Sequence, residues 1–252
     1  MRSPNLFFRQ AAAEFARVIQ VVPHNLVARI ELAQIYLLNR LPDKALECLR
    51  EPIDRPDKFG LNATNSVNMN LLVSAAYFQQ NKLSEGARVF DQEINRHPDD
   101  ITLLTTATQA YFLRGLYTNA LRVIETRLKQ APDDPAWLFG KGYAYIQLGD
   151  NDNAVKAMTR VLEIQTNNSA ARFNRALAYF KSDKLDAARA DYSALQETYT
   201  NSFQVAFGLG ELAWRQTNNA EALRNYQIYL ANAPTNSPEY SNITERVKSL
   251  KR

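Results

Sequence analysis

The feature that most constrains this chain is a sequence period of 34 residues. Tyr77, Tyr111, Tyr145 and Tyr179 lie 34 positions apart. Three further columns keep the same register: small residues, large apolar residues, and a closing proline or threonine. The small residues stand nine positions after the tyrosine column, at Gly86, Ala120, Ala154, Ala188 and Ala222. A period of this length is typical of a supersecondary unit that buries its apolar face only by stacking on its neighbours.

Each unit shows two stretches of helical spacing rather than one. In one unit these stretches are 138–148 and 154–162, and Gly149 interrupts the pattern between them. Asp150 or Asp152 is then expected to cap the second helix. The acidic residues between units are expected to serve as turn and cap residues in the same way: Asp99, Asp100, Asp133 and Asp134.

The register divides the chain into about six and a half units, which we expect to form one solenoid over residues 1–252. Five units follow one another without insertion or deletion: 67–100, 101–134, 135–168, 169–202 and 203–236. Upstream lie a half unit at 1–25, which matches only a second helix, and a unit at 26–66 with seven extra residues. Residues 237–252 are expected to form a closing helix. We expect the insertion, with Phe59 and Leu61, to be a surface loop; the alternative is that it folds over a binding groove.

The period, the four columns and the helix–turn–helix layout resemble the tetratricopeptide repeat (TPR) family. The resemblance implies an all-α fold, a right-handed α-solenoid of antiparallel helix pairs. It also implies that first helices line a concave groove where partners bind. Ser74 and Gly86 depart from the pattern in unit 67–100, and we expect each to loosen its interface by about 1 kcal/mol, as for glycine in a helix interior.

The chemistry-bearing residues do not form a catalytic constellation. His24 and His97 fall in the turns of two different units, and Cys48 lies in a second helix beside an apolar residue. The string at 140–145 lacks the spacing of a phosphate loop, and the run at 150–153 lacks the glycine and glutamate of a calcium loop. We therefore expect no enzyme activity, no cofactor and no metal site.

The groove columns carry aromatic residues, with polar side chains between them. Aromatic rings offer a large contact area at low entropic cost, and this favours binding of a peptide segment or a protein partner. The same columns also pack between neighbouring repeats, so the sequence leaves open whether the ladder is a binding surface or core. The predicted partner-binding residues are Phe78, Phe112, Phe139, Tyr143, Phe173, Asn174, Phe180, Lys181, Phe207, Trp214 and Arg215.

Charge and composition narrow the class of partner. The net charge is only +4, and Lys181 and Arg215 do not make a basic track, so we expect no nucleic-acid partner. Only Asn174 and Lys181 match the residues with which some TPR proteins grip a terminal carboxylate, so we do not expect binding of that kind. No apolar run is long enough to span a membrane.

Two other roles and one compartment remain as hypotheses. The chain could be the regulatory or targeting TPR segment of a larger multidomain protein or enzyme. It could also self-associate through its N-terminal end, because a lone second helix exposes the apolar side meant for its partner helix. A composition poor in cysteine, with one such residue, and rich in Asn, Gln and Thr favours an exported or periplasmic bacterial protein.

Overall fold

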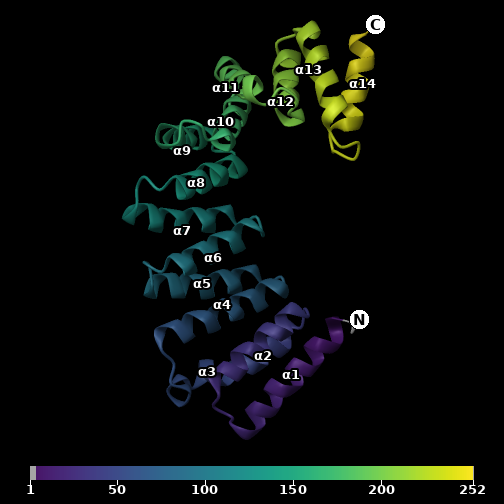
Figure 1. Ribbon diagram of the computed structural model, residues 1–252. Helices are drawn as coiled ribbons and strands as arrows, with labels where there is room; N and C mark the ends of the chain where they lie inside the picture. Colours follow the sequence, from purple (N-terminus) through teal and green to yellow (C-terminus); the bar gives the residue numbers. More distant parts are fainter. Residues whose placement is uncertain (1–3, 252) are drawn as a thin grey trace. The chain divides into compact units, whose positions relative to one another are not determined.

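The computed structural model describes residues 4–251, and the predicted all-α repeat fold is confirmed over them. This part of the chain contains fourteen α-helices, one short 3-10 helix and no strand. The helices divide into two compact units, with the division between Arg114 and Gly115. Figure 1 shows that each unit is a succession of helices packed on their sequence neighbours.

Unit 1 holds the first six α-helices and the 3-10 helix. Their bounds are α1 Pro4–Val21, α2 Leu26–Leu38, α3 Pro42–Asp54, η1 Pro56–Phe59, α4 Ala63–Gln79, α5 Leu83–Arg96 and α6 Ile101–Phe112. Helix α1 packs on α2, and α4 packs on both α2 and α3. The insertion thus forms a turn of helix, η1, between α3 and α4.

Unit 2 holds the other eight helices. Their bounds are α7 Tyr117–Gln130, α8 Pro135–Leu148, α9 Asn151–Ile164, α10 Ser169–Lys181, α11 Leu185–Thr198, α12 Phe203–Arg215, α13 Asn219–Asn232 and α14 Tyr240–Leu250. Each helix packs on the next along the chain, and α10 also contacts α8 and α12.

The turn inside each repeat has one backbone geometry, whatever its residue. Six residues at the same register position have positive φ: Arg40, Asn81, Gly115, Gly149, Asp183 and Thr217. In five of these turns the following amide donates to a carbonyl five residues earlier, as Leu41 N does to Tyr36 O at 2.9 Å. This hydrogen bond and the left-handed residue are the elements of a Schellman motif, which satisfies carbonyls at the end of the first helix.

The turns between repeats end in N-caps, as the sequence predicted for several of them. Asp100 accepts a hydrogen bond from Leu103 N at 2.9 Å, and Asp134 accepts one from Ala136 N at 3.1 Å. In one turn inside a repeat, Asp150, the first of the two candidates, likewise caps α9 by accepting from Asn153 N. A carboxylate or amide at this position satisfies backbone donors that the first turn leaves free.

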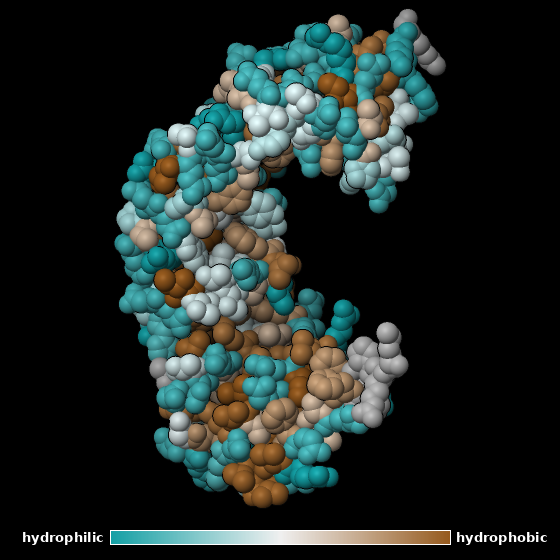
Figure 2. Space-filling model, viewed as in Figure 1, coloured by the Kyte–Doolittle hydropathy of each residue, from teal (hydrophilic) through white to brown (hydrophobic). Residues whose placement is uncertain are grey.

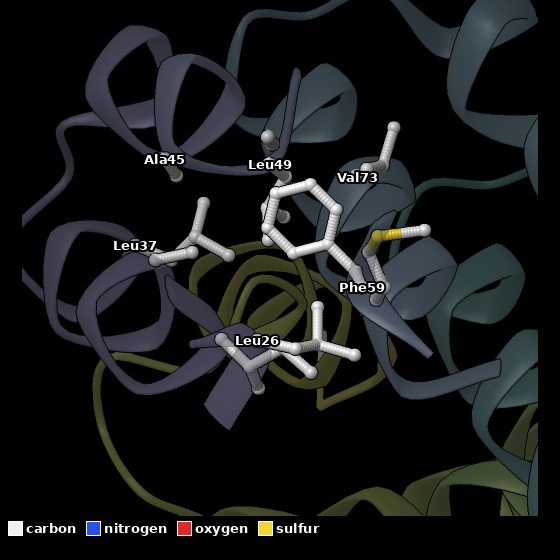
Figure 3. Close-up of a cluster of buried hydrophobic side chains, with 10 residues drawn as sticks. Leu26, Leu37, Ala45, Leu49, Phe59 and Val73 are labelled. Atoms are coloured by element: carbon white, nitrogen blue, oxygen red, sulfur yellow. The ribbon is translucent and has the colours of Figure 1, made fainter. Parts of the chain in front are cut away.

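The insertion contributes to the core of unit 1, which differs from both sequence interpretations of it. Phe59, at the end of η1, is buried among side chains from α2, α3 and α4, and Leu61 packs on the same cluster. Figure 3 shows the Phe59 ring beside Leu49, in the cluster that also holds Leu26 and Val73. The apolar ring drives this placement, because burying a phenylalanine outweighs leaving the segment extended in water.

The closing helix begins later than the sequence suggested. Ser237 does not cap it; its hydroxyl donates to Pro234 O at 2.7 Å, and α14 starts at Tyr240. Ile243 and Val247 are buried against α12 and α13, while Ser241 and Glu245 face the solvent. Helix α14 therefore closes unit 2 with an apolar inner side and a polar outer side.

Candidate functional site

Phe78, on α4 of unit 1, is a core residue. Its side chain is only 6% exposed. The ring centroid lies 5.9 Å from that of Phe90 and 6.3 Å from that of Tyr111, and the Arg114 guanidinium covers the ring at 4.3 Å. A Cβ on Gly86 would come within 2.7 Å of the Phe78 ring, so the glycine makes the space that the ring fills. A partner could reach little of this residue.

The predicted groove aromatics of α6 and α8 (Phe112, Phe139 and Tyr143) are half-buried. Phe112 ends α6, and Phe139 and Tyr143 pack on the apolar cluster around α8 and α9. Tyr143 also meets Tyr117 edge to face at 6.4 Å. These side chains divide their surface between packing and solvent.

Two predicted residues of unit 2, Phe180 and Arg215, form one group. The Arg215 guanidinium lies 4.5 Å from the centroid of the Phe180 ring and donates to Phe180 O at 3.1 Å. It also pairs with Asp183 at 3.2 Å. The arginine is therefore held by a ring and a carboxylate rather than left as a mobile charge.

Trp214 receives a similar cover from the closing helix. Arg246 of α14 lies 5.1 Å from the Trp214 ring and pairs with Glu211 at 2.5 Å. Trp214 is nonetheless 38% exposed. Phe207, on the same helix, packs against Tyr229 at 5.6 Å, and Lys181 is exposed at the end of α10.

Phe173 and Asn174 line an open pocket in unit 2, which we name the α10 pocket. Its volume is about 290 Å³. The lining residues are Ser169, Ala170, Phe173, Asn174, Leu195, Tyr199, Ser202, Gln204 and Val205. They come from α10, from the end of α11 and from the start of α12. Apolar walls with a few amides and hydroxyls, and no charged side chain, suit an uncharged guest.

Local packing fixes the position of Phe173. Its ring meets the buried Tyr192 edge to face at 5.6 Å. Tyr192 in turn lies against Gly208, where an added Cβ would come within 2.6 Å of the tyrosine ring. Burial, with a smaller contribution from Asp191, raises the pKa of Tyr192, so its phenol stays neutral at physiological pH. The glycine of α12 thus sets the depth of the tyrosine that supports the pocket wall.

Several contributors to this surface were not predicted. Tyr199 stands at a register position that holds His97, Ala131, Gln165 and Ala233 in other repeats, and this large aromatic side chain was a usable signal. Gln204 and Arg246 gave no comparable signal, because their roles depend on which helices meet in space.

The described residues also show what the site does not contain. No three His, Cys, Asp or Glu side chains among residues 4–251 gather closely enough to hold a metal ion. Burial raises the pKa of the Cys48 thiol, which lowers its thiolate fraction and its nucleophilicity. None of the described helices combines the length and apolar character needed to cross a bilayer.

Solved structures share this fold at low sequence identity. The C-terminal part of a TPR repeat-containing protein from Cytophaga hutchinsonii is 17% identical, with a TM-score of 0.70 over 96% of this chain and 95% of that chain. A TPR protein from Parabacteroides merdae is 14% identical, with a TM-score of 0.54 over 97% and 93%. YrrB, described as a TPR protein with an unusual peptide-binding site, is 17% identical, with a TM-score of 0.57 over 82% and 97%. At such identities the likeness shows the fold alone.

The sequence itself gives the family. No curated protein matches the chain at a significant level. A tetratricopeptide repeat family model, however, matches residues 104–170, 144–203 and 173–237, which together cover more than half of the chain. The chain therefore belongs to the tetratricopeptide repeat family.

Proposed function

We propose that this protein is a non-catalytic scaffold that binds an extended segment of a partner protein. The segment would lie along the first helix of each repeat in unit 2, that is, α8, α10 and α12. An uncharged apolar side chain of the partner would enter the α10 pocket. Asn174 and Gln204 would bond the partner's backbone beside it. The observation that carries the proposal is the pocket itself, because two predicted groove residues, Phe173 and Asn174, line it together.

The α10 pocket has the size and lining of an anchor site. At about 290 Å³ it is at the lower end of small-molecule sites, so it suits one or two side chains better than a cofactor. Asn174 donates to Ala170 O through its amide nitrogen, and this fixes the side chain with its oxygen as an acceptor. Rigid aromatic anchors and oriented amides are the usual means by which a peptide is held.

Two further observations support the choice of a protein partner. Two arginines of unit 2 are engaged, Arg215 with Asp183 and Phe180, and Arg246 with Glu211, and this disfavours a basic track for nucleic acid. YrrB has a peptide-binding site according to its description, and it shares this fold. The hypothesis that the chain is a regulatory or targeting segment of a larger protein is compatible with such binding. That the protein is an exported or periplasmic bacterial protein stays a prediction from its composition.

A displayed library of random peptides tests the proposal. Peptides selected on the wild-type protein should share an apolar residue next to a short extended stretch. Gln204→Ala and Phe173→Ala should weaken their binding by about tenfold or more, the effect of losing one anchor contact. The matched control is Gln227→Ala, an exposed glutamine on α13 away from the pocket.

Each outcome of this experiment decides the question. If Gln204→Ala alone weakens binding while Gln227→Ala does not, the α10 pocket is the site. If the selected peptides bind all three variants as they bind wild type, the pocket is not the site. Circular dichroism must show that Phe173→Ala keeps its helices, since Phe173 also packs on Tyr192.

Self-association is a second candidate, favoured by the surface of α1. Phe7 and Val21 are 69% and 77% exposed, and Val18 of the same helix and Val22 just after it are also exposed. Figure 2 shows hydrophobic side chains gathered on the visible face of unit 1. Molar mass measured by light scattering over a range of concentrations should then rise toward a dimer, and Val21→Ser should reduce that rise. A constant monomer mass would exclude this role.

A further inference from the structure

One isoleucine of unit 1 is exposed at a register position that is buried or half-buried in the other repeats. Ile53 on α3 corresponds to Ile94 on α5 and Leu162 on α9 once the seven extra residues are allowed for. Ile94 and Leu162 are each 7% exposed, whereas Ile53 is 41% exposed. The difference follows from the local chain path. The 3-10 helix η1 follows α3, where a short turn follows α5 and α9, so the chain after Ile53 takes a different course from the chain after Ile94 and Leu162.

Ile53 lines an open pocket of about 500 Å³ between α3 and α4, which we name the α3 pocket. Its apolar walls are Leu46 and Ile53 of α3 with Val73 and Tyr77 of α4. Val73 is buried, and Leu46 and Tyr77 are half-buried. An apolar side chain that entered here would contact these walls and cover Ile53, much as Ile94 and Leu162 are covered in their own repeats.

The rim of the α3 pocket is acidic. One face of α3 carries three carboxylates and one guanidinium at this rim, from Asp43, Glu47, Asp54 and Arg50. Arg50 lies 3.8 Å from Asp54, and both side chains are largely exposed. Asp43 accepts a hydrogen bond from the Gln80 amide, which leaves its negative charge in place. A basic segment would therefore be attracted to this rim and an acidic one repelled.

We propose that the α3 pocket is a second docking site, for a partner segment in which an apolar side chain is flanked by lysine or arginine. The apolar side chain fills the space beside Ile53, and the flanking cations face Asp43, Glu47 and Asp54. This site is separate from the α10 pocket and takes a ligand of different charge. The acidic rim therefore selects a basic partner segment, whereas the α10 pocket has no charged side chain.

The test measures the binding of a defined peptide to the full chain. The probe has one leucine between two pairs of lysines, and its binding is followed by the methyl resonances of Ile53, Leu46 and Val73. Two matched peptides accompany it: one with serine in place of leucine, and one with glutamates in place of lysines. The proposal expects the leucine–lysine peptide to shift these resonances and to bind about tenfold or more tightly than either relative.

Two variants show which part of the pocket acts. Ile53→Ser should weaken the leucine–lysine peptide by about tenfold, whereas Ile101→Ser should leave its affinity unchanged. Ile101 is the matched control because it is also an exposed isoleucine of unit 1, and it lies outside the pocket. The combined change Asp43→Asn, Glu47→Gln and Asp54→Asn should weaken binding and remove most of its dependence on salt.

The contrary results are equally definite. The proposal is overturned if the methyl resonances do not shift, if the serine peptide binds as well as the leucine peptide, or if the glutamate peptide binds as well as the lysine peptide. Binding that Gln204→Ala weakens and Ile53→Ser does not would place this peptide in the α10 pocket instead.

Discussion

Ile53 and Ile94 occupy the same position in two successive repeats of unit 1, yet Ile53 is 41% exposed and Ile94 is 7% exposed. Both lie near the end of a second helix, so the repeat pattern points them in the same direction. What differs is the connection that follows. A short turn leads from α5 into α6, whereas η1 lies between α3 and α4. The repeat sets where a side chain points, and the junction with the next repeat decides whether it is buried.

Ile94→Ala should give the largest effect. Truncating a buried isoleucine removes apolar contacts and leaves a cavity, so the free energy of unfolding should fall by about 2–4 kcal/mol. The midpoint of urea unfolding, followed by circular dichroism, measures this fall. A fall of less than about 1 kcal/mol would mean that the junction between α5 and α6 is as open as that between α3 and α4.

Gly208→Ala tests a junction from the opposite direction, by overfilling it. The added methyl group would lie 2.6 Å from the Tyr192 ring, so the ring must move and stability should fall by about 1–3 kcal/mol. Because Tyr192 supports Phe173, the α10 pocket should also lose its peptide. Combining the change with Tyr192→Leu should cost less than the two single changes added together. Strict additivity would show that the ring and the glycine are not in contact.

Ile53→Ala should have a small effect on stability, below about 1 kcal/mol, because 41% of the residue is already exposed. The same urea experiment measures it beside Ile94→Ala, which serves as its control. If both variants lost the same stability, Ile53 would be as buried as Ile94, and the α3 pocket would be closed in solution.

Thr217→Gly should have the smallest effect, and it should be stabilising. Thr217 has φ of 58°, a conformation that a β-branched residue adopts only with strain. Glycine relieves the strain but loses more entropy on folding, so we expect a net gain of about 0.5 kcal/mol. Asn81→Gly is the control, since asparagine tolerates this conformation, and it should change little. A loss of stability at Thr217 would show that the turn holds no strain.

Much of the fold could be predicted because it repeats locally. Helix pairs, the caps Asp100 and Asp134, and the all-α class follow from spacing and from the chemistry of helix ends. The sequence also named Phe173 and Asn174, which do line a common pocket. That these residues bind a partner remains a prediction.

Contacts between specific helices could not be predicted, because they depend on small shifts in packing. Ser74 and Gly86 look like two weak points in the sequence, yet the Ser74 hydroxyl donates to Gly86 O at 2.6 Å. The glycine also admits the Phe78 ring, which is why Phe78 is core in the structure. The seven-residue insertion was expected to be a surface loop, but Phe59 within it enters the core of unit 1.

The turn inside each repeat has a consequence for how fast the molecule forms. Its hydrogen bond joins residues only five positions apart, as from Lys184 N to Tyr179 O. Proteins dominated by contacts between sequence neighbours fold quickly, and repeat arrays can start folding at any of their units. With the same turn geometry available at six places in the chain, folding has several equivalent starting points. The rate of refolding should therefore depend little on any single turn.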